Sequence, residues 1–545
     1  MEPKLKEKVW DGSLERPIYE EWKKTKRYAF SKSSKKVFSI DTPPPYVNTP
    51  VHIGQAATYV LMDFFARFRR MMGYEVLFPL GMDRNGLPIE IAAEKRFHIK
   101  FNQVSREEFI GKCYELLEES SAASTESFLR LGISFNSWEV GQGIGDMYET
   151  DSPEYRALTQ ETFIDLYTKG LVYEDERVNN YCPGCQTTVA DAEVEYEDRP
   201  AFFYDIKFRC KETGEDVIIG TTRPELLCSL GMIIFNPEDS RYRKFAGKTA
   251  VSPIYHKEVL IKAHPAAEME KGTGIMMMCS FGDLTDIRFF REENLQPVIA
   301  IGKDGRMNEH AGFLAGMSVA DGRKAIVKSL EEGSLLVGKA QAKAHRTPVC
   351  ERSKDPIEFI TMKEFYVKQL PYKKKMKELA HQLHFYHESS RQILLDWIES
   401  VSIDWPITRR RYYATEVPLW YCTQCSKVIV PPKDKYYQPW REDPPVKRCS
   451  CGSTQFIGEE RVFDTWFDSS ISPLYVLKYS RDNAFFKKHS PCSLRPQGKE
   501  IIRTWLYYTV LKDYLLTNKL IFRDVWINYH IVDEKGHRCP RAKGM

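Results

Sequence analysis

Cysteine pairs are the residues of this 545-residue sequence whose spacing most directly indicates chemistry. Cys422 and Cys425 form a C-x-x-C pair, and Cys449 and Cys451 follow after a polar, proline-rich loop. Four thiolates at this separation are typical of a zinc ribbon. Because four protein ligands leave no open position on the metal, we expect this zinc ion to be structural.

A second cysteine pair, Cys182 and Cys185, encloses a Pro-Gly dipeptide. A single C-x-x-C pair also fits a redox centre, but no thioredoxin-like pattern surrounds it, and this favours zinc. A knuckle needs further ligands, and the candidate is Cys350. Three thiolates with an open or water-filled fourth position predict a weaker metal site than the ribbon.

Residues 36–90 contain the other group of residues that could do chemistry. A proline-rich loop ends at His52 and Gly54, where a helix is expected to begin, so free backbone N–H groups and the positive end of a helix dipole would face a ligand. Gly54 would admit a flat ring close to the backbone, and His52 could donate to a phosphate. The pattern favours a nucleotide, although such a triplet taken alone also fits an ordinary loop.

Two apolar runs and a helical pattern position this loop. Residues 37–40 and 74–78 are apolar, and residues 55–72 between them are amphipathic, which predicts a βαβ unit. Further helices are expected at 105–131 and 154–171. Helices that alternate with short apolar runs indicate an α/β fold with a doubly wound parallel sheet. A leading helical arm within residues 1–35 is expected to pack on this sheet.

The composition bounds the class of protein. With 42% hydrophobic and 28% charged residues, the chain fits a soluble globular protein of roughly two to four domains. We expect a cytoplasmic protein without membrane contact, because no apolar run approaches about 20 residues and the start is not a signal peptide. The net charge of +4 means that contacts with nucleic acid must come from local basic patches. Thirteen cysteines without a secretory signal favour metal sites over disulfides.

The chain divides by composition into three parts. Residues 1–198 form the predicted first half of the main domain, with half of the cysteine knuckle. Residues 199–340 have short β-rich runs and many glycines, and they are predicted to be an inserted domain. Residues 341–545 return to the helical pattern and contain the ribbon at 420–455.

Three motifs together resemble a known family. They are DTPPP at 41–45, HIGQ at 52–55 and GMDRNGLP at 81–88. This combination is similar to the class I aminoacyl-tRNA synthetases, in the valine/isoleucine/leucine subgroup. One departure is Gln55, which stands where the family signature has a second histidine; glutamine keeps an N–H donor but carries no charge.

The resemblance implies a Rossmann-type catalytic core with an inserted editing domain. It also implies a monomeric ligase that activates valine with ATP and Mg²⁺, transfers it to tRNA(Val), and hydrolyses mischarged threonyl-tRNA(Val). One alternative is a non-catalytic or editing-only tRNA-binding remnant. Isoleucine specificity is a lesser alternative.

The resemblance assigns roles to particular residues of the synthetic site. Asp83 would bind the substrate ammonium, and Trp466, in a predicted pocket strand, would form a flat apolar wall. Glu500 would accept from the ribose hydroxyls, with Lys499 in place of the more frequent His. The predicted catalytic residues are His52, Gln55 and Lys535. The predicted ATP-binding residues are Pro43, Pro44, His52, Gly54, Gln55, Gly498 and Glu500, and the predicted amino-acid-binding residues are Pro45, Asp83 and Trp466.

The resemblance also assigns the editing residues. In the established example for this class of enzyme, a valine pocket rejects the isosteric threonine by only about a hundredfold, so a second, hydrolytic site is required. Asp286 would anchor the α-amino group of the mischarged residue. Leu226 stands where many relatives have threonine. The predicted editing residues are Thr221, Thr222, Arg223, Asp283 and Asp286.

Three further features depend on the resemblance. The family often has C-x-x-C at 350–353, and this chain has Ser353. Arg409, Arg410 and Arg411 could hold an RNA acceptor stem by phosphate contact and stacking. Residues 537–545 stand where the second family signature is expected, and restoring one base near codon 538 could encode it. We therefore expect a one-base deletion there, an absent anticodon-binding domain and poor valine activation, with a divergent remnant as the alternative.

Overall fold

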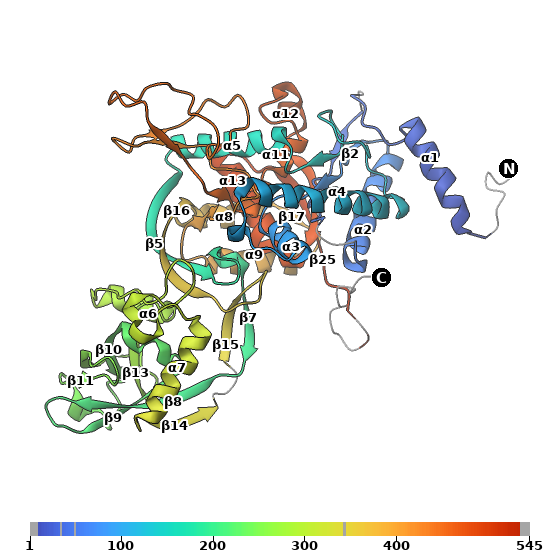
Figure 1. The fold of residues 1–545 in the computed structure, drawn as a ribbon. Coiled ribbons are helices and arrows are strands. Elements are labelled where there is room, and N and C mark those ends of the chain that lie inside the picture. The colour runs from blue at the N-terminus through green and yellow to red at the C-terminus, as the bar shows by residue number, and fades with distance from the viewer. Residues whose placement is uncertain (1–8, 33–34, 48–50, 342–344, 533, 535–545) are drawn as a thin grey trace. The chain divides into compact units, whose positions relative to one another are not determined.

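The protein folds into two compact units, which are described separately. The computed structural model describes residues 9–532 and 534, apart from 33–34, 48–50 and 342–344. The first unit consists of Met1–Tyr173 and Phe365–Met545, and the second of Glu174–Glu364 (Figure 1). The second unit is wider than the predicted insert 199–340 because it also includes the strands around the cysteine knuckle. Among the helices in the described part of the chain, none has the length and apolar character that a membrane crossing requires.

Short parallel strands form the centre of the first unit. β1 (Val37–Ser39) pairs with β2 (Glu75–Leu77), and β24 (Cys492–Gly498) pairs with β25 (Phe522–Asn528), which also pairs with β17 (His384–Phe385). A parallel bridge between Ile40 and Leu494 joins the two groups, and Asp41 N–H donates to the Leu494 carbonyl over 3.0 Å. The strand order is therefore β2-β1-β24-β25-β17. This is the Rossmann-type arrangement that the sequence predicts.

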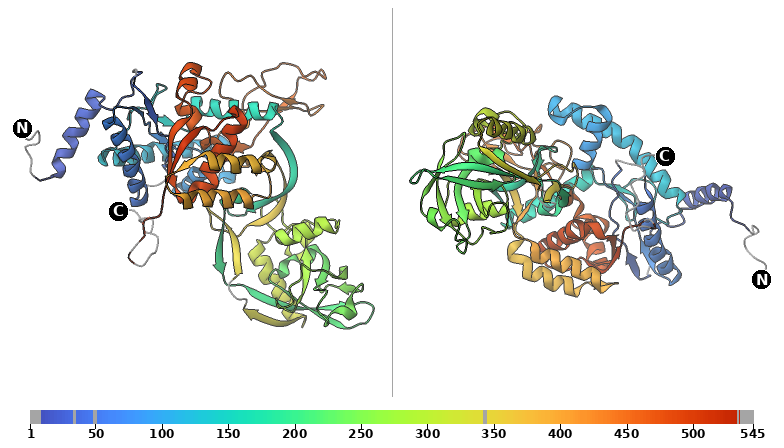
Figure 2. Two further views of the ribbon diagram at one scale, coloured as in Figure 1. Left: turned by 180° about the vertical axis from the view of Figure 1, so that it is seen from behind. Right: turned by 90° about the horizontal axis from the view of Figure 1, so that it is seen from below.

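Helices cover this sheet. α2 (Ile53–Met71) connects β1 to β2, and α13 (Tyr507–Thr517) precedes β25. The sheet residues Phe38, Ile40 and Leu494 and the helix residue Met62 are all buried in one hydrophobic cluster. α8 (Lys373–Gln382) and α9 (Glu388–Ser400), gold in Figures 1 and 2, pack against each other next to β17.

Two further helices of the first unit agree closely with their predicted bounds. α4 spans Arg106–Arg130 and α5 spans Pro153–Thr168; their N-caps are Ser105 and Ser152, whose hydroxyls accept from the first turn. α3 (Leu87–Phe97) precedes them. The leading arm α1 (Glu15–Thr25) packs on helices and not on the sheet, because Tyr19 donates to the Arg130 carbonyl of α4 and Trp22 lies against Arg67 of α2.

A seven-stranded sheet forms the centre of the second unit. Its order is β13-β10-β12-β11-β8-β14, and β9 pairs with β8. The strands are β8 (Phe202–Cys210), β9 (Asp216–Thr221), β10 (Leu230–Phe235), β11 (Thr249–Val251), β12 (Glu258–Ala263), β13 (Ile275–Cys279) and β14 (Leu336–Gln341). The apolar runs of the sequence become β8, β9 and β10, and α7 (Val319–Glu332) contributes Ile326 and Leu330 to the same core.

Two strand pairs surround the cysteine knuckle. β7 (Val194–Arg199) pairs with β15 (His345–Cys350) in register, with Cys350 opposite Val194. β5 (Val172–Cys182) lies between β6 (Thr187–Thr188) and β16 (Glu358–Val367). β5 ends at Cys182 and β15 ends at Cys350, and the Sγ atoms of Cys182, Cys185 and Cys350 lie within 4.8 Å of one another.

The ribbon is a small antiparallel sheet within the first unit. β20 (Trp420–Cys422) lies between β21 (Val428–Ile429) and β22 (Phe456–Gly458), over a core of Trp420, Ile429 and Tyr437. The short helices α10 (Thr465–Ser469), α11 (Ser472–Val476) and α12 (Asn483–His489) then return the chain to β24.

Candidate nucleotide, amino-acid, editing and metal sites

The predicted nucleotide residues lie at the point where the strand order reverses. β1 and β24 are neighbours, joined by the bridge between Ile40 and Leu494. In open α/β sheets, the ligand crevice lies beyond the carboxyl ends of the strands at such a point. Pro43, Pro44 and His52 follow β1, and Gly498 and Glu500 lie at the end of β24. The fold thus brings together two segments that are about 450 residues apart in sequence.

His52 is the N-cap of α2. Its Nδ1 accepts from the N–H groups of Gly54 at 3.2 Å and Gln55 at 3.4 Å. In return, Gln55 Oε1 accepts from the His52 N–H at 3.2 Å, which completes a capping box. The expectation that backbone N–H groups at the start of this helix are free for a ligand is therefore wrong for residues 54 and 55, because the histidine ring accepts from both.

Gly54 leaves room for the His52 ring. A Cβ atom at residue 54 would lie 3.1 Å from His52 Cε1, which is closer than most real contacts of a Cβ atom. The proline-rich loop before the helix is held by Tyr59, whose hydroxyl donates to the Pro43 carbonyl. Below the loop, the buried Asp41 carboxylate pairs with Arg495 of β24, and this ion pair fixes the two central strands to each other.

The turn after β24 presents a carboxylate. Glu500 folds back over Gly498, where a Cβ atom would lie 2.3 Å from Glu500 Oε1, so a larger residue at 498 would displace the Glu500 carboxylate from this position. The Glu500 side chain is 58% exposed, and its Oε2 lies 3.7 Å from His530 Nε2. An exposed carboxylate beside the crevice could accept from ribose hydroxyls. Lys535, the third predicted catalytic residue, lies outside the described residues, as do residues 537–545.

The predicted amino-acid site is built around a buried carboxylate. Asp83, which is 3% exposed, donates its N–H to the Pro45 carbonyl over 2.9 Å. Its Oδ1 accepts from Thr150 Oγ1 at 3.0 Å and from the Asn85 N–H at 3.3 Å. The roles of Thr150 and Asn85 were not predicted, and neither residue has a local sequence signal that would have indicated them.

Trp466 lies on a short helix and not on the predicted strand. Asp464 caps α10 by accepting from the Trp466 N–H at 3.3 Å, so the chain turns into a helix at this point. The segment that carries Asp83 packs directly on this helix: a Cβ atom at Gly86 would lie 2.1 Å from Thr465 Oγ1. Asp83 and Trp466 therefore belong to two segments that touch.

Two of the three consecutive arginines are structural. Arg411, which is 3% exposed, pairs with Glu90 at 2.6 Å and with Glu94 at 2.9 Å. Arg409 is equally buried and pairs with Asp464 at 3.3 Å. The prediction that this run contacts RNA phosphates is wrong for these two residues, because their guanidinium groups are buried against carboxylates. Of the three arginines, only Arg410 is exposed.

The predicted editing residues converge in the second unit. Arg223, two residues after the end of β9, donates through Nη1 to the Gly282 carbonyl over 2.9 Å and through Nη2 to Glu358 Oε2 over 2.7 Å. Thr221 Oγ1 accepts from the Arg223 N–H at 3.0 Å, and Thr222 lies half-buried between them in sequence. These contacts bring the threonine segment next to the start of α6 (Leu284–Glu292).

Asp283 and Asp286 lie in the first turn of α6. Asp283 is its N-cap and accepts from the Asp286 N–H at 2.9 Å, while Asp286 Oδ1 accepts from the Cys279 N–H at 3.1 Å. Burial, followed by the negative charge of Asp283, raises the pKa of Asp286 well above its ordinary value. A carboxyl group in this state would be stabilised in its ionised form by an ammonium group. A Cβ atom at Gly282 would lie 2.2 Å from Asp286 Oδ2 and 3.4 Å from Leu226 Cδ1.

The ribbon cysteines have the spacing of a zinc site. The Sγ atoms of Cys422 and Cys451 are 3.6 Å apart, as are those of Cys425 and Cys449, and all four lie within 4.8 Å of one another. A tetrahedral Zn²⁺ with bonds of about 2.3 Å places its sulfur ligands about 3.8 Å apart. The N–H of Cys425 lowers the pKa of Cys422 to about 6, which favours the thiolate form that binds metal. These residues fit zinc.

The knuckle cysteines also lie together. Cys182, Cys185 and Cys350 have Sγ atoms within 4.8 Å of one another, and the Cys185–Cys350 distance is 3.9 Å. Ser353 Oγ lies 3.1 Å from Cys182 Sγ. The hydroxyl that replaces the fourth family cysteine therefore lies beside one of the three thiols. Three thiolates and a hydroxyl fit zinc less well than four thiolates.

Comparison with known proteins agrees with this geometry. Residues 17–545 match the family model described as "tRNA synthetases class I (I, L, M and V)". The chain belongs to this family.

Several curated relatives are valine–tRNA ligases. The chain is 42% identical to that of Aeropyrum pernix, 45% to that of Pyrobaculum aerophilum and 43% to that of Nanoarchaeum equitans, over 99%, 98% and 96% of its own length. It spans 66% of the length of the first two relatives and 69% of the third. A solved LeuRS from Agrobacterium radiobacter K84, in a ternary complex with tRNA and LeuAMS, matches with a TM-score of 0.50 at 17% identity over 98% of this chain and 70% of that chain. The likeness to the solved LeuRS concerns the fold alone.

Proposed function

We propose that the protein is a valine–tRNA ligase, which activates valine with ATP, transfers it to tRNA(Val) and hydrolyses mischarged threonyl-tRNA(Val). The observation that carries the proposal is the packing of Gly86 on Thr465. This contact joins the segment of Asp83 to the helix of Trp466, next to the crevice at β1 and β24. An acidic anchor for an ammonium group, an apolar wall and a nucleotide crevice are the parts that amino-acid activation needs.

The first step needs no nucleophile from the protein. The valine carboxylate attacks the α-phosphorus of ATP, an acyl–phosphate bond forms, and pyrophosphate leaves. Asp83 holds the valine ammonium, Trp466 covers the side chain, and Glu500 accepts from the ribose hydroxyls. His52, Gln55 and Lys535 donate to the phosphates, and Mg²⁺ would add charge neutralisation on the leaving pyrophosphate. Catalysis is therefore positioning and charge stabilisation.

The second step is transfer to RNA. A ribose hydroxyl at the end of tRNA(Val) attacks the carbonyl carbon of the adenylate, and AMP leaves with the bonding electrons. The second unit then hydrolyses the threonyl ester, with Asp286 anchoring the α-amino group and Thr221, Thr222, Arg223 and Asp283 around it. The raised pKa of Asp286 supports this role, since binding a cation would offset the cost of the buried charge.

Zinc has a structural role in this proposal. The ribbon thiolates Cys422, Cys425, Cys449 and Cys451 would hold one ion and stiffen the insert between α9 and α10. Cys182, Cys185 and Cys350 would hold a second ion more weakly.

The decisive experiment is calorimetric titration with non-hydrolysable adenylates, because it measures binding without requiring turnover. The valyl analogue should bind at least tenfold more tightly than the isoleucyl analogue, since a pocket sized for valine must accommodate one extra methylene group. The reverse order would replace the assignment by isoleucine specificity. Binding of neither analogue would favour the editing-only remnant.

Editing is tested separately with threonyl-tRNA(Val) at high protein concentration. The wild-type chain should release threonine, and Asp286→Ala should lose this activity while it keeps its affinity for the valyl analogue. Leu226→Thr, which restores the residue of many relatives, serves as a matched control in the same site. Equal deacylation by wild type and Asp286→Ala would remove Asp286 from its assigned role.

A further inference from the structure

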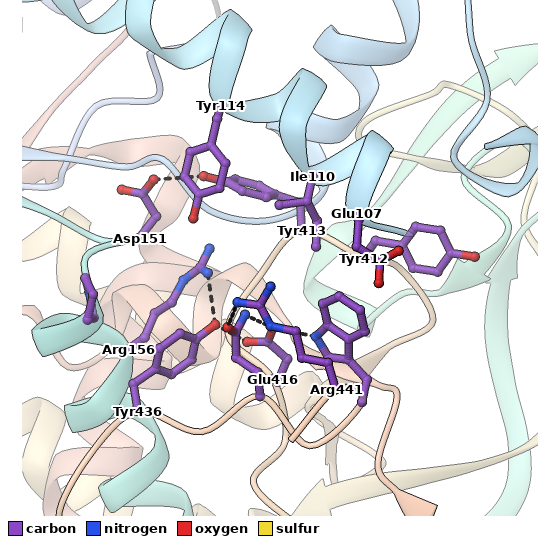
Figure 3. A pocket seen from close by; sticks show the side chains of 13 residues that line it. Glu107, Ile110, Tyr114, Asp151, Arg156, Tyr412, Tyr413, Glu416, Tyr436 and Arg441 are labelled. Atoms are coloured by element: carbon purple, nitrogen blue, oxygen red, sulfur yellow. Dashed lines mark hydrogen bonds between the residues drawn. The ribbon is translucent and has the colours of Figure 1, made fainter. Parts of the chain in front are cut away.

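In the first unit, a buried arginine acts on the amino-acid site through another residue. Arg156, which is 4% exposed, lines a pocket of about 340 Å³ (Figure 3). Its Nη1 donates to the Tyr436 hydroxyl over 3.0 Å, and its Nη2 donates to Asn85 Oδ1 over 2.6 Å. Because the Asn85 N–H donates to Asp83 Oδ1, Arg156 supports Asp83 through one intervening residue. The second unit contains a larger arrangement of the same kind.

Four charged side chains of the second unit form a connected network next to the predicted editing residues. Glu225 accepts from Arg223 Nε at 3.0 Å, and it also accepts from Arg323 Nε at 2.8 Å and Nη2 at 2.6 Å. Glu358 accepts from Arg223 Nη2 at 2.7 Å. We call these four residues the charge clamp. Arg223 and Glu225 stand at the start of the 3₁₀ helix η4 (Pro224–Ser229), whereas Arg323 comes from α7 and Glu358 from β16, so the clamp joins segments that are distant in sequence.

The members of the clamp depend on one another for their charge. Glu225 is fully buried, and Glu358 is 4% exposed. Burial raises the pKa of Glu225, but its contacts with Arg323 and Arg223 outweigh this effect, so the pKa lies below its ordinary value. Burial raises the pKa of Glu358, and Arg223 opposes that shift. Because the loss of one partner leaves another buried charge without its ion pair, a change at one member should be transmitted along the clamp.

The clamp directs Arg223 toward the protein. Each of its three guanidinium nitrogens donates to a protein oxygen: Nε to Glu225, Nη2 to Glu358, and Nη1 to the Gly282 carbonyl over 2.9 Å. The two carboxylates therefore fix the plane of the guanidinium group, and its third nitrogen holds the carbonyl of Gly282.

The position of Gly282 determines where the Asp286 carboxyl group lies. Gly282 directly precedes Asp283, the N-cap of α6, whose carboxylate accepts from the Asp286 N–H. A Cβ atom at Gly282 would lie 2.2 Å from Asp286 Oδ2, so a shift of this backbone would displace the carboxyl group. Arg223 also acts through its charge: burial raises the pKa of Asp286, and the positive charge of Arg223 opposes that shift.

We propose that Glu358 and Arg323 are positioning residues for the hydrolysis of threonyl-tRNA(Val). Through the other two members of the clamp they hold the Gly282 carbonyl, and this keeps the Asp286 carboxyl group where it binds the α-ammonium group of the ester. The inference rests on the proposed editing function, because it concerns how that site is held. Neither residue belongs to the set that the family resemblance assigns to editing.

The test measures how strongly the full chain prefers an ester that has an α-amino group. The two substrates are threonyl-tRNA(Val) and the same tRNA esterified with β-hydroxybutyric acid, which lacks only that group. The wild type should hydrolyse the threonyl ester with the higher kcat/KM. Glu358→Gln and Arg323→Gln should each lower kcat/KM for the threonyl ester by about a hundredfold, the effect of a displacement near 1 Å, and should leave kcat/KM for the other ester nearly unchanged. Arg323→Lys, which keeps a cation beside Glu225, should recover part of the loss.

Asp239→Asn is the matched control. Asp239 is a carboxylate of the same unit that is also 4% exposed, and it accepts from Arg241 Nη2 at 2.6 Å instead of from a clamp residue. This variant should keep the wild-type preference for the threonyl ester. Because the Arg323 side chain is 39% exposed, Arg323→Gln covers the case in which Glu358→Gln does not fold.

The outcomes separate this inference from the proposed function. Clamp variants that keep the wild-type preference, or that lose both activities to the same extent, would overturn the inference, while hydrolysis by the wild type leaves the proposed editing function standing. Loss of the preference in Asp239→Asn would overturn it as well, because the effect would then belong to any buried ion pair of the unit. A wild type that hydrolyses neither ester, or both equally, would remove the assigned role of Asp286 and the inference with it.

Discussion

Replacing Gly86 by alanine should disable the amino-acid site without touching any residue that contacts substrate. Gly86 has φ +82° and ψ −167°, a region that is essentially restricted to glycine. Holding an alanine there costs about 1–3 kcal/mol. The added Cβ atom would also lie 2.1 Å from Thr465 Oγ1, so that α10 or the segment of Asp83 must move by about 1 Å.

The two contributions can be separated with a second substitution. Thr465→Ala removes Oγ1 and leaves Cβ, which lies 3.2 Å from the new atom at residue 86 and needs only a small adjustment. Thr465→Ala alone should cost about 1 kcal/mol, the usual scale for a lost buried hydroxyl. The double variant should be less destabilised than the sum of the single variants by about 1–2 kcal/mol, and the backbone strain should remain.

The assay is the affinity for the valyl-adenylate analogue, together with urea unfolding of the first unit. Gly86→Ala should weaken binding by about a hundredfold, the effect expected of a displacement near 1 Å. The double variant should recover part of this loss. If Gly86→Ala binds like the wild type, or if the double variant is as weak as the sum of the single ones, the contact with Thr465 does not position the site and the central argument for the proposed function is wrong.

Three further outcomes are expected. Gly282→Ala should abolish threonyl-tRNA hydrolysis and keep the affinity for the valyl analogue, because its Cβ atom would displace the Asp286 carboxyl from a distance of 2.2 Å; intact hydrolysis would contradict this placement. In the ribbon, Cys449→Ser should lower the bound zinc measured by atomic absorption. In the knuckle, Ser353→Cys should slow zinc loss to a chelator, since it would complete a four-thiolate set. An unchanged rate of zinc loss in Ser353→Cys would show that the knuckle holds no metal. Burial lowers the pKa of Lys512, which lies beside Asp513 and Asp468, to about 7. The folded state therefore holds fewer protons than the unfolded state between pH 7 and about 10.4, and the stability of the first unit should rise with pH in this range by at most about 1.4 kcal/mol per pH unit. Lys512→Met should remove this slope, and an unchanged slope would assign it to other groups.

Local sequence patterns predict the helices and strands, but they do not predict which strands pair with each other. The apolar run before the proline loop and the amphipathic stretch after it predicted β1 and α2 within two residues, because both signals are local. The pairing of Ile40 with Leu494 has no local signal, since it joins segments about 450 residues apart. It was accessible only through the resemblance to a family whose fold is known.

Charged residues were the least predictable part of the site. Arg409 and Arg411 belong to a basic run, and such runs are usually exposed. Here each guanidinium group is buried against carboxylates, and Arg411 is held by Glu90 and Glu94 from a helix more than 300 residues earlier. A buried ion pair is decided by tertiary partners, so the sequence around either member does not reveal it.

The capping box at His52 gives a physical reason why glutamine can stand where the family signature has its second histidine. Since His52 Nδ1 accepts from two backbone N–H groups, it cannot carry the ring proton, which must then reside on Nε2 in the neutral tautomer. Gln55 uses its carbonyl oxygen on the His52 N–H and keeps its amide hydrogens as donors. Both side chains thus direct their acceptor atoms to the backbone, and their remaining capacity is donation, which is what an anionic phosphate requires. A sequence signal for this existed, because a capping box needs a glutamine or glutamate three residues after the cap. The signal is weak in this sequence because histidine replaces the usual serine or threonine at the cap.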